Sequence, residues 1–357
     1  MIVDAILFND ELELLQHRIR WLNNYVDVTV ILEADFTFSG KLKSLVAKSN
    51  LTNLAELTEG LVVPLQMTIE TFDINLPDNP WDIELASRDY LLKHLIANHP
   101  EDRIIFSDLD EIPSLEQIRV ISKLDLDENL ETFSIPMQVY YRYANWQQVG
   151  SGENWNLAKT FNSSFAPSVA EIRSSNQFSN LPGKGSHLSY LSMTAEQITS
   201  KFDAFSHSEL SGFRYIEDTL TRISDVYFVD HIGRFDVAGR GLIRVLDKNK
   251  VDDICKYLIE KNLKFLRSGE TPPTLKRLMA SSVITYLRKS KNTPKSLSRQ
   301  IIEKSLERNN ENLGIIPSLV ILTHSYFRVL RRYFVLQLKR LIPAQIKFRI
   351  KKLYVEL

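Results

Sequence analysis

Several features that would assign this chain to a special class of protein are missing from its sequence. Its 357 residues contain one cysteine, Cys255, which excludes an intrachain disulfide and predicts a reducing compartment. No run of about 18 uninterrupted apolar residues is present; the best candidate, residues 315–327, is broken by Pro317 and His324, among others. The apolar N-terminal run has no basic segment ahead of it, so no secretory signal peptide is predicted. These absences predict a cytoplasmic protein.

Several site motifs are missing as well. No glycine-rich phosphate loop of the Walker or Rossmann type occurs, which disfavours a kinase or a dehydrogenase. The sequence contains no cluster of cysteine and histidine residues of the kind that binds zinc. What is present is an average globular composition, with 44% hydrophobic and 25% charged residues, which excludes wholesale disorder.

The net charge of zero hides an uneven distribution of charge. Residues 271–357 carry 18 Lys or Arg against 4 Asp or Glu, so the first 270 residues carry 26 basic against 40 acidic ones. Such asymmetry predicts an acidic body and a basic tail that meets something anionic. We expect a first domain over residues 1–240 and a basic, mainly helical C-terminal region over residues 241–357.

The first 140 residues alternate between strand-like and helix-like patterns. Strands are expected at residues 2–8, 26–32, 67–72, 103–106 and 131–137, with helices after Asn9 or Asp10, over residues 82–98 and after a Ser114–Gln117 capping box. Alternation of this kind predicts an α/β fold with a mostly parallel sheet, helices on both faces, and a site at the carboxyl ends of the strands. The aromatic segment from Tyr140 to His231 is expected to complete the sheet.

An acidic turn follows the predicted fourth strand. Asp108, Asp110 and Glu111 lie within four residues, and such close carboxylates raise one another's pKa unless a cation sits among them. Carboxylate oxygens suit Mg²⁺ or Mn²⁺, and these ions keep open positions for phosphate oxygens. The turn is therefore what an enzyme acting on a nucleotide sugar needs. A solvated acidic turn that leads into the next helix remains the alternative.

The motifs around this turn resemble those of glycosyltransferase family 17, the β-1,4-mannosyl-glycoprotein 4-β-N-acetylglucosaminyltransferases. The matching stretches are residues 8–15 with Arg18, Val26 and Asp27; residues 32–41; Trp81, Glu84 and Arg88; residues 106–113; residues 185–190; and residues 201–209. The resemblance covers roughly residues 1 to 210. It implies a GT-A-like fold and inverting transfer of a sugar from a nucleotide sugar, most often N-acetylglucosamine from UDP.

Roles for the acidic turn follow from the needs of such an enzyme. It must hold a nucleoside, neutralise a diphosphate and deprotonate an acceptor hydroxyl. Asp108 would bind the ribose or metal-bound water, and Asp110 would bind the metal. Glu111 would either bind the metal or cap the following helix. His187 would either complete the metal ligands or be a structural histidine bonded to the backbone.

The second strand and the following helix provide candidates for holding the donor. Glu33 and Asp35 lie where a nucleoside enters an open α/β sheet, or else in a solvated turn. Lys41 would reach phosphate or be exposed.

Glu84 and Arg88 are four residues apart on the predicted helix, so they form either a surface ion pair or, if the helix faces the site, a clamp in which Arg88 grips the diphosphate. Trp81 is either core or a stacking platform.

The candidates for the general base lie near the end of the resemblance. Glu209 matches a carboxylate base best, His207 is the second choice, and Asp203 and Glu153 compete with them. An aromatic cluster is either a sugar platform or, as we favour, core: Tyr140, Tyr141, Tyr143, Trp146 and Trp155.

The sequence thus predicts an inverting, metal-dependent glycosyltransferase that uses Mn²⁺ or Mg²⁺ and a UDP-sugar. The alternatives are a nucleotidyltransferase with the same acidic turn and a non-catalytic protein that binds lipid or another polyanion.

Between residues 318 and 357, apolar and basic residues alternate in a pattern that favours a helix lying on an anionic membrane, which would make the enzyme peripheral on the inner face. Packing of this helix on the acidic body is the alternative. The pattern disfavours nucleic acid as a partner, since the apolar residues are aliphatic as often as aromatic.

Overall fold

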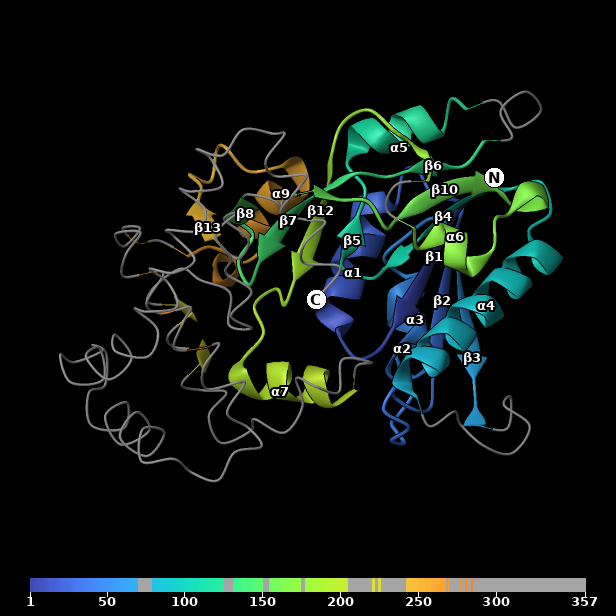
Figure 1. The fold of residues 1–357 in the computed structure, drawn as a ribbon. Coiled ribbons are helices and arrows are strands. Elements are labelled where there is room, and N and C mark those ends of the chain that lie inside the picture. Colours follow the sequence, from blue (N-terminus) through green and yellow to red (C-terminus); the bar gives the residue numbers. More distant parts are fainter. Residues whose placement is uncertain are drawn as a thin grey trace, which may run out of the picture. The chain divides into compact units, whose positions relative to one another are not determined.

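A computed structural model of the chain is shown in Figure 1. It describes residues 1–69, 79–124, 131–149, 154–174, 177–204 and 242–267, together with residues 220, 221, 224, 225, 269, 277, 280 and 284. The chain divides into two compact units. The first unit, described below, comprises Met1–Gln148, Gly152–Glu217 and Arg244–Gly269.

The first unit is built on a seven-stranded sheet in the order β11-β6-β10-β4-β1-β2-β3. Its strands are β1 Ile2–Phe8, β2 Val28–Ala34, β3 Leu61–Met67, β4 Arg103–Asp108, β6 Phe133–Ser134, β10 Lys159–Asn162 and β11 Ser179–Asn180. β4, β1, β2 and β3 are parallel neighbours, whereas β10 runs antiparallel to β4 and to β6. The carboxyl ends of β1, β2 and β4 therefore meet at one edge of the sheet, as the alternating sequence pattern predicted.

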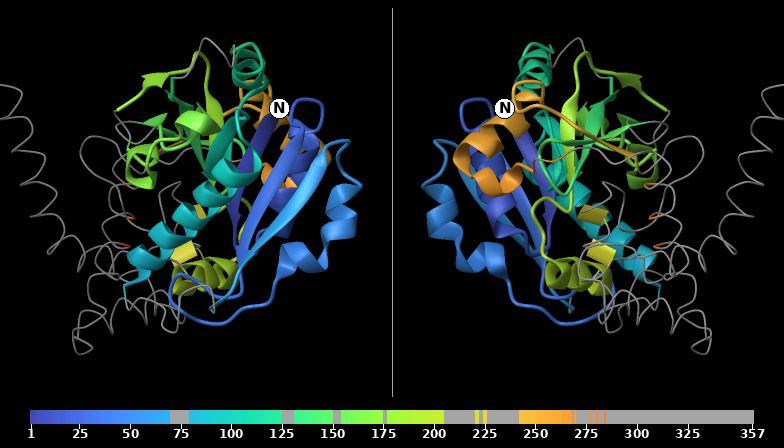
Figure 2. Two further views of the ribbon diagram at one scale, coloured as in Figure 1. Left: turned by 90° about the vertical axis from the view of Figure 1, so that its right-hand side faces the viewer. Right: turned by 90° about the vertical axis from the view of Figure 1, so that its left-hand side faces the viewer.

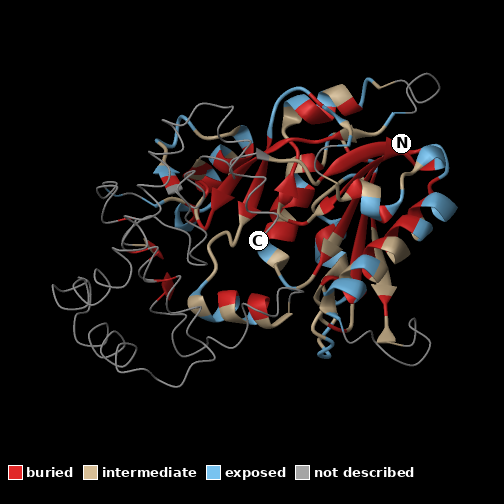
Figure 3. Ribbon diagram, in the orientation of Figure 1, coloured by how far each residue is buried: buried red, intermediate tan, exposed pale blue. Residues whose placement is uncertain are grey.

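Helices cover both faces of this sheet because successive strand residues point to opposite sides. Ile6 of β1 packs in one core cluster with Leu15 of α1 (Leu12–Leu22), whereas Val3 packs in another with Leu91 of α4 (Pro80–Asn98). Figure 2 shows α4 on one side of the strands and the α2–α3 pair on the other. The central strands are buried nearly throughout (Figure 3). The other helices among the described residues are α2 Val46–Ser49, α3 Leu51–Ala55, α5 Leu115–Ile121, α6 Val169–Ile172, α7 Ala195–Ala204 and α9 Asp253–Lys261, with 3₁₀ turns at Ser163–Phe165 and Leu263–Phe265.

A second sheet carries the other side of the site. Its order is β13-β8-β7-β12-β5, with β9 paired to β7. The strands are β5 Glu111–Ile112, β7 Met137–Tyr141, β8 Trp146–Val149, β9 Asn154–Trp155, β12 Gly185–Ser189 and β13 Leu242–Val245. The expectation that the aromatic segment completes the first sheet holds for β10 and β11 but is wrong for β8, β9, β12 and the part of β7 that the segment includes. In the second sheet, antiparallel pairing sets His187 directly opposite Glu111.

The predicted elements are confirmed where the periodicity is strong. β1, α4, β4 and the Ser114–Gln117 capping box all form. Three details are wrong. α1 begins after Glu11 without a side-chain cap, and the third strand ends at Met67, where the sequence predicted it to begin. The strand predicted over residues 131–137 is divided between β6 of the first sheet and β7 of the second. The predicted domain boundary at residue 240 lies outside the described residues. None of the helices described is long and apolar enough to cross a membrane.

Candidate active site

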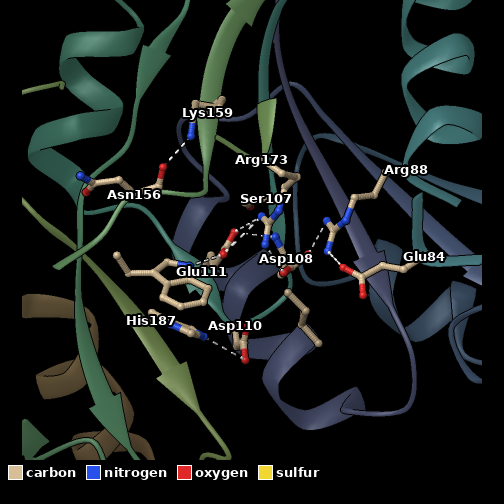
Figure 4. A network of polar contacts seen from close by, with 12 residues as sticks. Glu84, Arg88, Ser107, Asp108, Asp110, Glu111, Asn156, Lys159, Arg173 and His187 are labelled. Atoms are coloured by element: carbon tan, nitrogen blue, oxygen red, sulfur yellow. Dashed lines mark hydrogen bonds and ion pairs between the residues drawn. The ribbon is translucent and has the colours of Figure 1, made fainter. Parts of the chain in front are cut away.

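The acidic turn, residues 108–111, lies at the carboxyl end of β4 and runs into β5 (Figure 4). Its backbone is held by Arg18 of α1, a side chain with no exposed surface. Arg18 donates from Nη1 to the carbonyl oxygens of Asp108, Leu109 and Glu111 at 2.9, 3.1 and 2.8 Å. Its Nε and Nη2 bind the two carboxylate oxygens of Asp4 at 2.9 and 2.6 Å, and Nη2 also donates to Ser107. Arg18 therefore fixes the path of the turn and leaves its carboxylates to other partners.

Asp108 receives two guanidinium groups. Arg88 of α4 donates from Nη1 to Oδ1 at 2.7 Å, and Arg173, the residue after α6, donates from Nη2 to Oδ2 at 3.0 Å. Burial would raise the pKa of Asp108, but the charges of Arg173 and Arg88 outweigh it and hold that pKa well below its usual range. Asp108 is therefore an anion at neutral pH, with arginine on both oxygens.

Glu111 is fully buried. One oxygen accepts the backbone N–H of Asp108 at 2.8 Å, the other accepts the indole N–H of Trp155, and Arg173 lies 3.4 Å away. These donors occupy both oxygens, so the prediction that Glu111 binds the metal is not supported by its surroundings. The alternative, that Glu111 caps the following helix, is wrong, because Ser114 caps α5.

Asp110 faces a different set of side chains. Its Oδ2 lies 3.5 Å from Nε2 of His187 on β12 and 3.7 Å from the ammonium group of Lys201 on α7. Burial would raise the pKa of Asp110, yet His187 and Lys201 lower it. The ring of His187 lies against that of Trp155, with 4.4 Å between centroids. Trp155 therefore contacts both Glu111 and His187.

Positive charge lies beside the acidic turn without a bound metal ion. The protein's own cations stand beside all three carboxylates: Arg88 and Arg173 at Asp108, Arg173 at Glu111, and Lys201 at Asp110. The pKa values of Asp108 and Asp110 are lowered, not raised as carboxylate repulsion alone predicts.

The predicted metal ligands are only partly brought together. Within the described residues, no group of three or more His, Cys, Asp or Glu side chains is arranged to hold a metal ion. Asp110 and His187 do face each other, and Nδ1 of His187 is buried with no hydrogen-bond partner in this part of the chain. Mg²⁺ is often held by one or two protein side chains, with phosphates and water completing its shell. The pair fits such an ion, whereas the predicted set of four does not.

The two acidic residues at the end of β2 have different surroundings. Glu33 is buried and accepts the backbone N–H groups of Val46, Ala47 and Lys48, so it caps α2 and is not exposed to a nucleoside. Asp35 has a buried carboxylate oxygen without a hydrogen-bond partner among the described residues. Lys41 is exposed, as its alternative interpretation predicted.

The predicted helix α4 does face the site. Arg88 is 4% exposed and binds both Glu84, at 2.9 Å, and Asp108, so the intrahelical pair forms inside the site and not on the surface. Burial would lower the pKa of Arg88, but Asp108 and Glu84 raise it. Trp81 is 47% exposed, which makes the core interpretation of this residue wrong.

The remaining candidates lie in the core, in the site, on α7, or outside the described residues. Tyr140, Tyr141 and Trp146 are buried, which confirms the core interpretation for them, whereas Trp155 belongs to the site. Glu209, His207 and Glu153 lie outside the described residues. Asp203, on α7, accepts the hydroxyl of Ser39 at its backbone carbonyl.

Sequence reasoning gave no role to Arg173, Lys201 or Lys159. Lys201 lies within a family motif and binds Glu11 at 2.7 Å, which together with Asp110 raises its pKa against the effect of burial. Arg173 follows a one-turn helix in an irregular segment, where no periodicity marks it. Lys159 is a fully buried lysine on β10 that donates to the carbonyl of Asn156, the residue after Trp155 of β9 (Figure 4).

The comparison with protein families decides the reaction class. The model of glycosyltransferase family 17 matches residues 1–228. The chain belongs to glycosyltransferase family 17. Membership assigns glycosyl transfer to the protein and implies a nucleotide sugar as donor and a glycan as acceptor. No curated protein matches the chain. The acidic turn, α4 and His187 all lie inside the matched residues, so the site belongs to the family 17 domain.

Proposed function

We propose that this family 17 enzyme transfers N-acetylglucosamine from UDP-N-acetylglucosamine to a glycan hydroxyl, with inversion at the anomeric carbon, on a GT-A-like domain. The observation that carries the proposal is the acidic turn at the carboxyl end of β4, where Asp110 faces His187 and two arginines meet on Asp108. An edge of this kind is where open α/β sheets bind nucleotides.

The proposed reaction needs one displacement and one proton transfer. The acceptor oxygen attacks the anomeric carbon from the face opposite the diphosphate, the carbon–oxygen bond to the diphosphate breaks, and UDP departs with the electron pair. Glu209, or else His207, takes the acceptor proton. The cations beside the turn, Arg88, Arg173 and Lys201, stabilise the negative charge that develops on the leaving diphosphate.

We further propose that the transfer uses Mn²⁺ or Mg²⁺, with Asp110 and His187 as its protein ligands. The ion would act as a Lewis acid on the leaving diphosphate. Asp35 supports the nucleoside part of the proposal, because it directly follows β2 and one of its carboxylate oxygens is buried with no hydrogen-bond partner among the described residues. Glu33 is left out of the proposed site because it caps α2.

The direct test is release of UDP from a panel of UDP-sugars with Mn²⁺, in the presence of candidate glycan acceptors. We expect release to be fastest with UDP-N-acetylglucosamine and to stop in EDTA. Release from every donor at background rate would contradict the transferase proposal, and full activity in EDTA would contradict the metal.

Asp110→Asn tests the metal ligand in the same assay. The change keeps the size of the side chain but removes the charge, so we expect transfer to fall at least a hundredfold, with the melting temperature nearly unchanged. Asp89→Asn is the matched control, because Asp89 pairs with Lys93 on the exposed surface of α4. Wild-type turnover in Asp110→Asn would remove this residue from the proposed mechanism.

A further inference from the structure

Asp108 is bound on both oxygens by arginines from separate segments of the chain. Arg88 comes from the middle of α4 and Arg173 from the residue that follows α6, and their contacts with Asp108 are 2.7 and 3.0 Å long. Figure 4 shows the two guanidinium groups meeting at this carboxylate. A guanidinium group binds a phosphate with the same planar geometry as it binds a carboxylate. Both arginines could therefore exchange Asp108 for phosphate.

The charges around the turn make this exchange depend on the cation. Three carboxylates lie in the turn, and Glu84 and Glu11 add two more next to Arg88 and Lys201. Among the described residues, the lysine and arginine side chains in ion-pair contact with these five carboxylates are Arg88, Arg173 and Lys201. A nucleoside diphosphate that arrives alone meets an excess of negative charge. A divalent cation that arrives alone finds Asp108 held by arginines and Asp110 beside Lys201.

We propose that Arg88 and Arg173 form a partner-exchange switch that makes the donor diphosphate and the divalent cation bind cooperatively. When the diphosphate binds, the two guanidinium groups move from Asp108 to its phosphate oxygens. Asp108 is then free to support the cation beside Asp110. This inference rests on the proposed function in that its two ligands are a nucleoside diphosphate and a divalent cation. It assigns phosphate binding to Arg173, and it makes the support that Asp108 gives to the cation depend on release from Arg88 and Arg173.

Linkage makes the proposal quantitative. If the diphosphate tightens cation binding by some factor, the cation must tighten diphosphate binding by the same factor. We expect that factor to be at least tenfold in the wild-type protein, a coupling of about 1.4 kcal/mol.

The test is calorimetric and needs neither sugar nor acceptor. Mn²⁺ is titrated into the full-length protein alone and with a saturating nucleoside diphosphate, and the diphosphate is titrated with and without Mn²⁺. UDP, GDP and ADP are all used, so that an error about the base does not decide the result. Independent binding of the two ligands, or failure of every nucleoside diphosphate to bind, would overturn the proposal.

Arg173→Gln separates the switch from a merely structural arginine. Losing one guanidinium group leaves an oxygen of Asp108 without its cation, so Mn²⁺ alone should bind at least threefold more tightly than to the wild type. The diphosphate should bind at least tenfold more weakly, and the coupling should shrink. If Arg173 has only a structural role, its loss loosens the site, and both Mn²⁺ and the diphosphate should bind more weakly. Arg173→Lys keeps the charge, so its affinities for Mn²⁺ and for the diphosphate should lie between those of the wild type and those of Arg173→Gln.

Arg119→Gln is the matched control, since Arg119 is an exposed arginine on α5. It should reproduce wild-type affinities and coupling. Weaker Mn²⁺ binding in Arg173→Gln would refute the exchange. This outcome can be told apart from that of the donor screen. An enzyme that uses another sugar would still show the coupling. An N-acetylglucosaminyltransferase that binds the two ligands independently would contradict the switch but not the proposed function.

Discussion

At the scale of the residue, buried charges determine the geometry of the site. Arg18 and Asp4 are 0% and 1% exposed, and the three guanidinium nitrogens of Arg18 donate six hydrogen bonds, to Asp4, to Ser107 and to three carbonyl oxygens of the turn. Replacing both partners of such a buried pair with apolar residues changes the stability of a protein little. Removing only one partner is costly, because the other charge stays buried without a partner.

We therefore expect Arg18→Met to lower the free energy of unfolding by about 3–5 kcal/mol and to abolish transfer. Asp4 loses its partner, and three carbonyl oxygens of the turn lose their donor. Urea denaturation followed by circular dichroism measures the loss. Arg20→Met, on the exposed side of the same helix, is the control. Equal stability of the two variants would show that Arg18 does not hold the turn.

Lys159 gives the protein a predicted dependence of stability on pH. Burial, with Arg173 adding to it, lowers the pKa of Lys159 from 10.5 to about 8. Below pH 8 the amine is charged in the folded and unfolded states alike, and the folded state bears the full cost of burying the charge. Between pH 8 and 10.5 the folded state releases the proton first, so this cost falls as the pH rises.

Lys159→Met should therefore be more stable than the wild type at pH 7, and its advantage should shrink above pH 8. The shift of pKa corresponds to a difference on the order of 3 kcal/mol, reduced by the lost hydrogen bond to Asn156. Denaturation of both proteins at pH 7, 8, 9 and 10 measures it. An advantage that is constant over this range would contradict the lowered pKa.

At the scale of the element, β12 brings His187 to the turn through close packing on β5. A side-chain Cβ on Gly185 would lie 2.5 Å from the carbonyl oxygen of Ile112 and 2.9 Å from the amide oxygen of Gln117. The backbone angle of Gly185 is not in the left-handed region, so the space itself demands glycine here. The register that sets His187 opposite Glu111 depends on this close approach.

Gly185→Ala should shift β12 away from β5 and cost about 1–3 kcal/mol of stability, as overpacking does elsewhere. Because His187 moves with the strand, we expect the concentration of Mn²⁺ needed for half-maximal activity to rise. Thermal unfolding and a Mn²⁺ titration of UDP release check the two effects. If the melting temperature and the Mn²⁺ requirement of the alanine variant equal those of the wild type, β5 and β12 can accommodate a side chain at this position.

At the scale of the whole molecule, the uneven charge calls for an explanation that the site does not supply. Apart from Arg277, the basic residues of the tail (residues 271–357) lie outside the described residues, and so do all of residues 318–357. We propose that this tail holds the enzyme at the anionic inner face of the membrane, where each basic residue can contribute about 1 kcal/mol.

Flotation with liposomes tests the tail. We expect the full-length protein to float with anionic vesicles at low salt, to be released at high salt, and not to float with neutral vesicles. Removal of residues 318–357 should abolish flotation without loss of UDP release. A full-length protein that stays soluble with every vesicle would make the membrane proposal wrong and favour packing of the tail on the acidic body.

The sequence by itself determined what depends on local order. The apolar runs of β1 and β4, the periodicity of α4 and the Ser114–Gln117 capping box could all be read from residues near one another in the chain. The position of the acidic turn followed too, because a polar group directly after a buried strand must lie at the edge of its sheet.

Only the tertiary structure decided which partner each charge received. Arg18 is 90 residues from Asp108, Arg173 is 65 residues from it, and Lys201 is 190 residues from Glu11. No periodicity relates such distant positions. The same limit explains Glu33, whose role as a cap for α2 depends on a helix 13 residues further along, and Trp155, which an aromatic cluster in sequence could not separate from the core. Pairing in a buried site is set by which strands become neighbours, and that is a property of the folded chain.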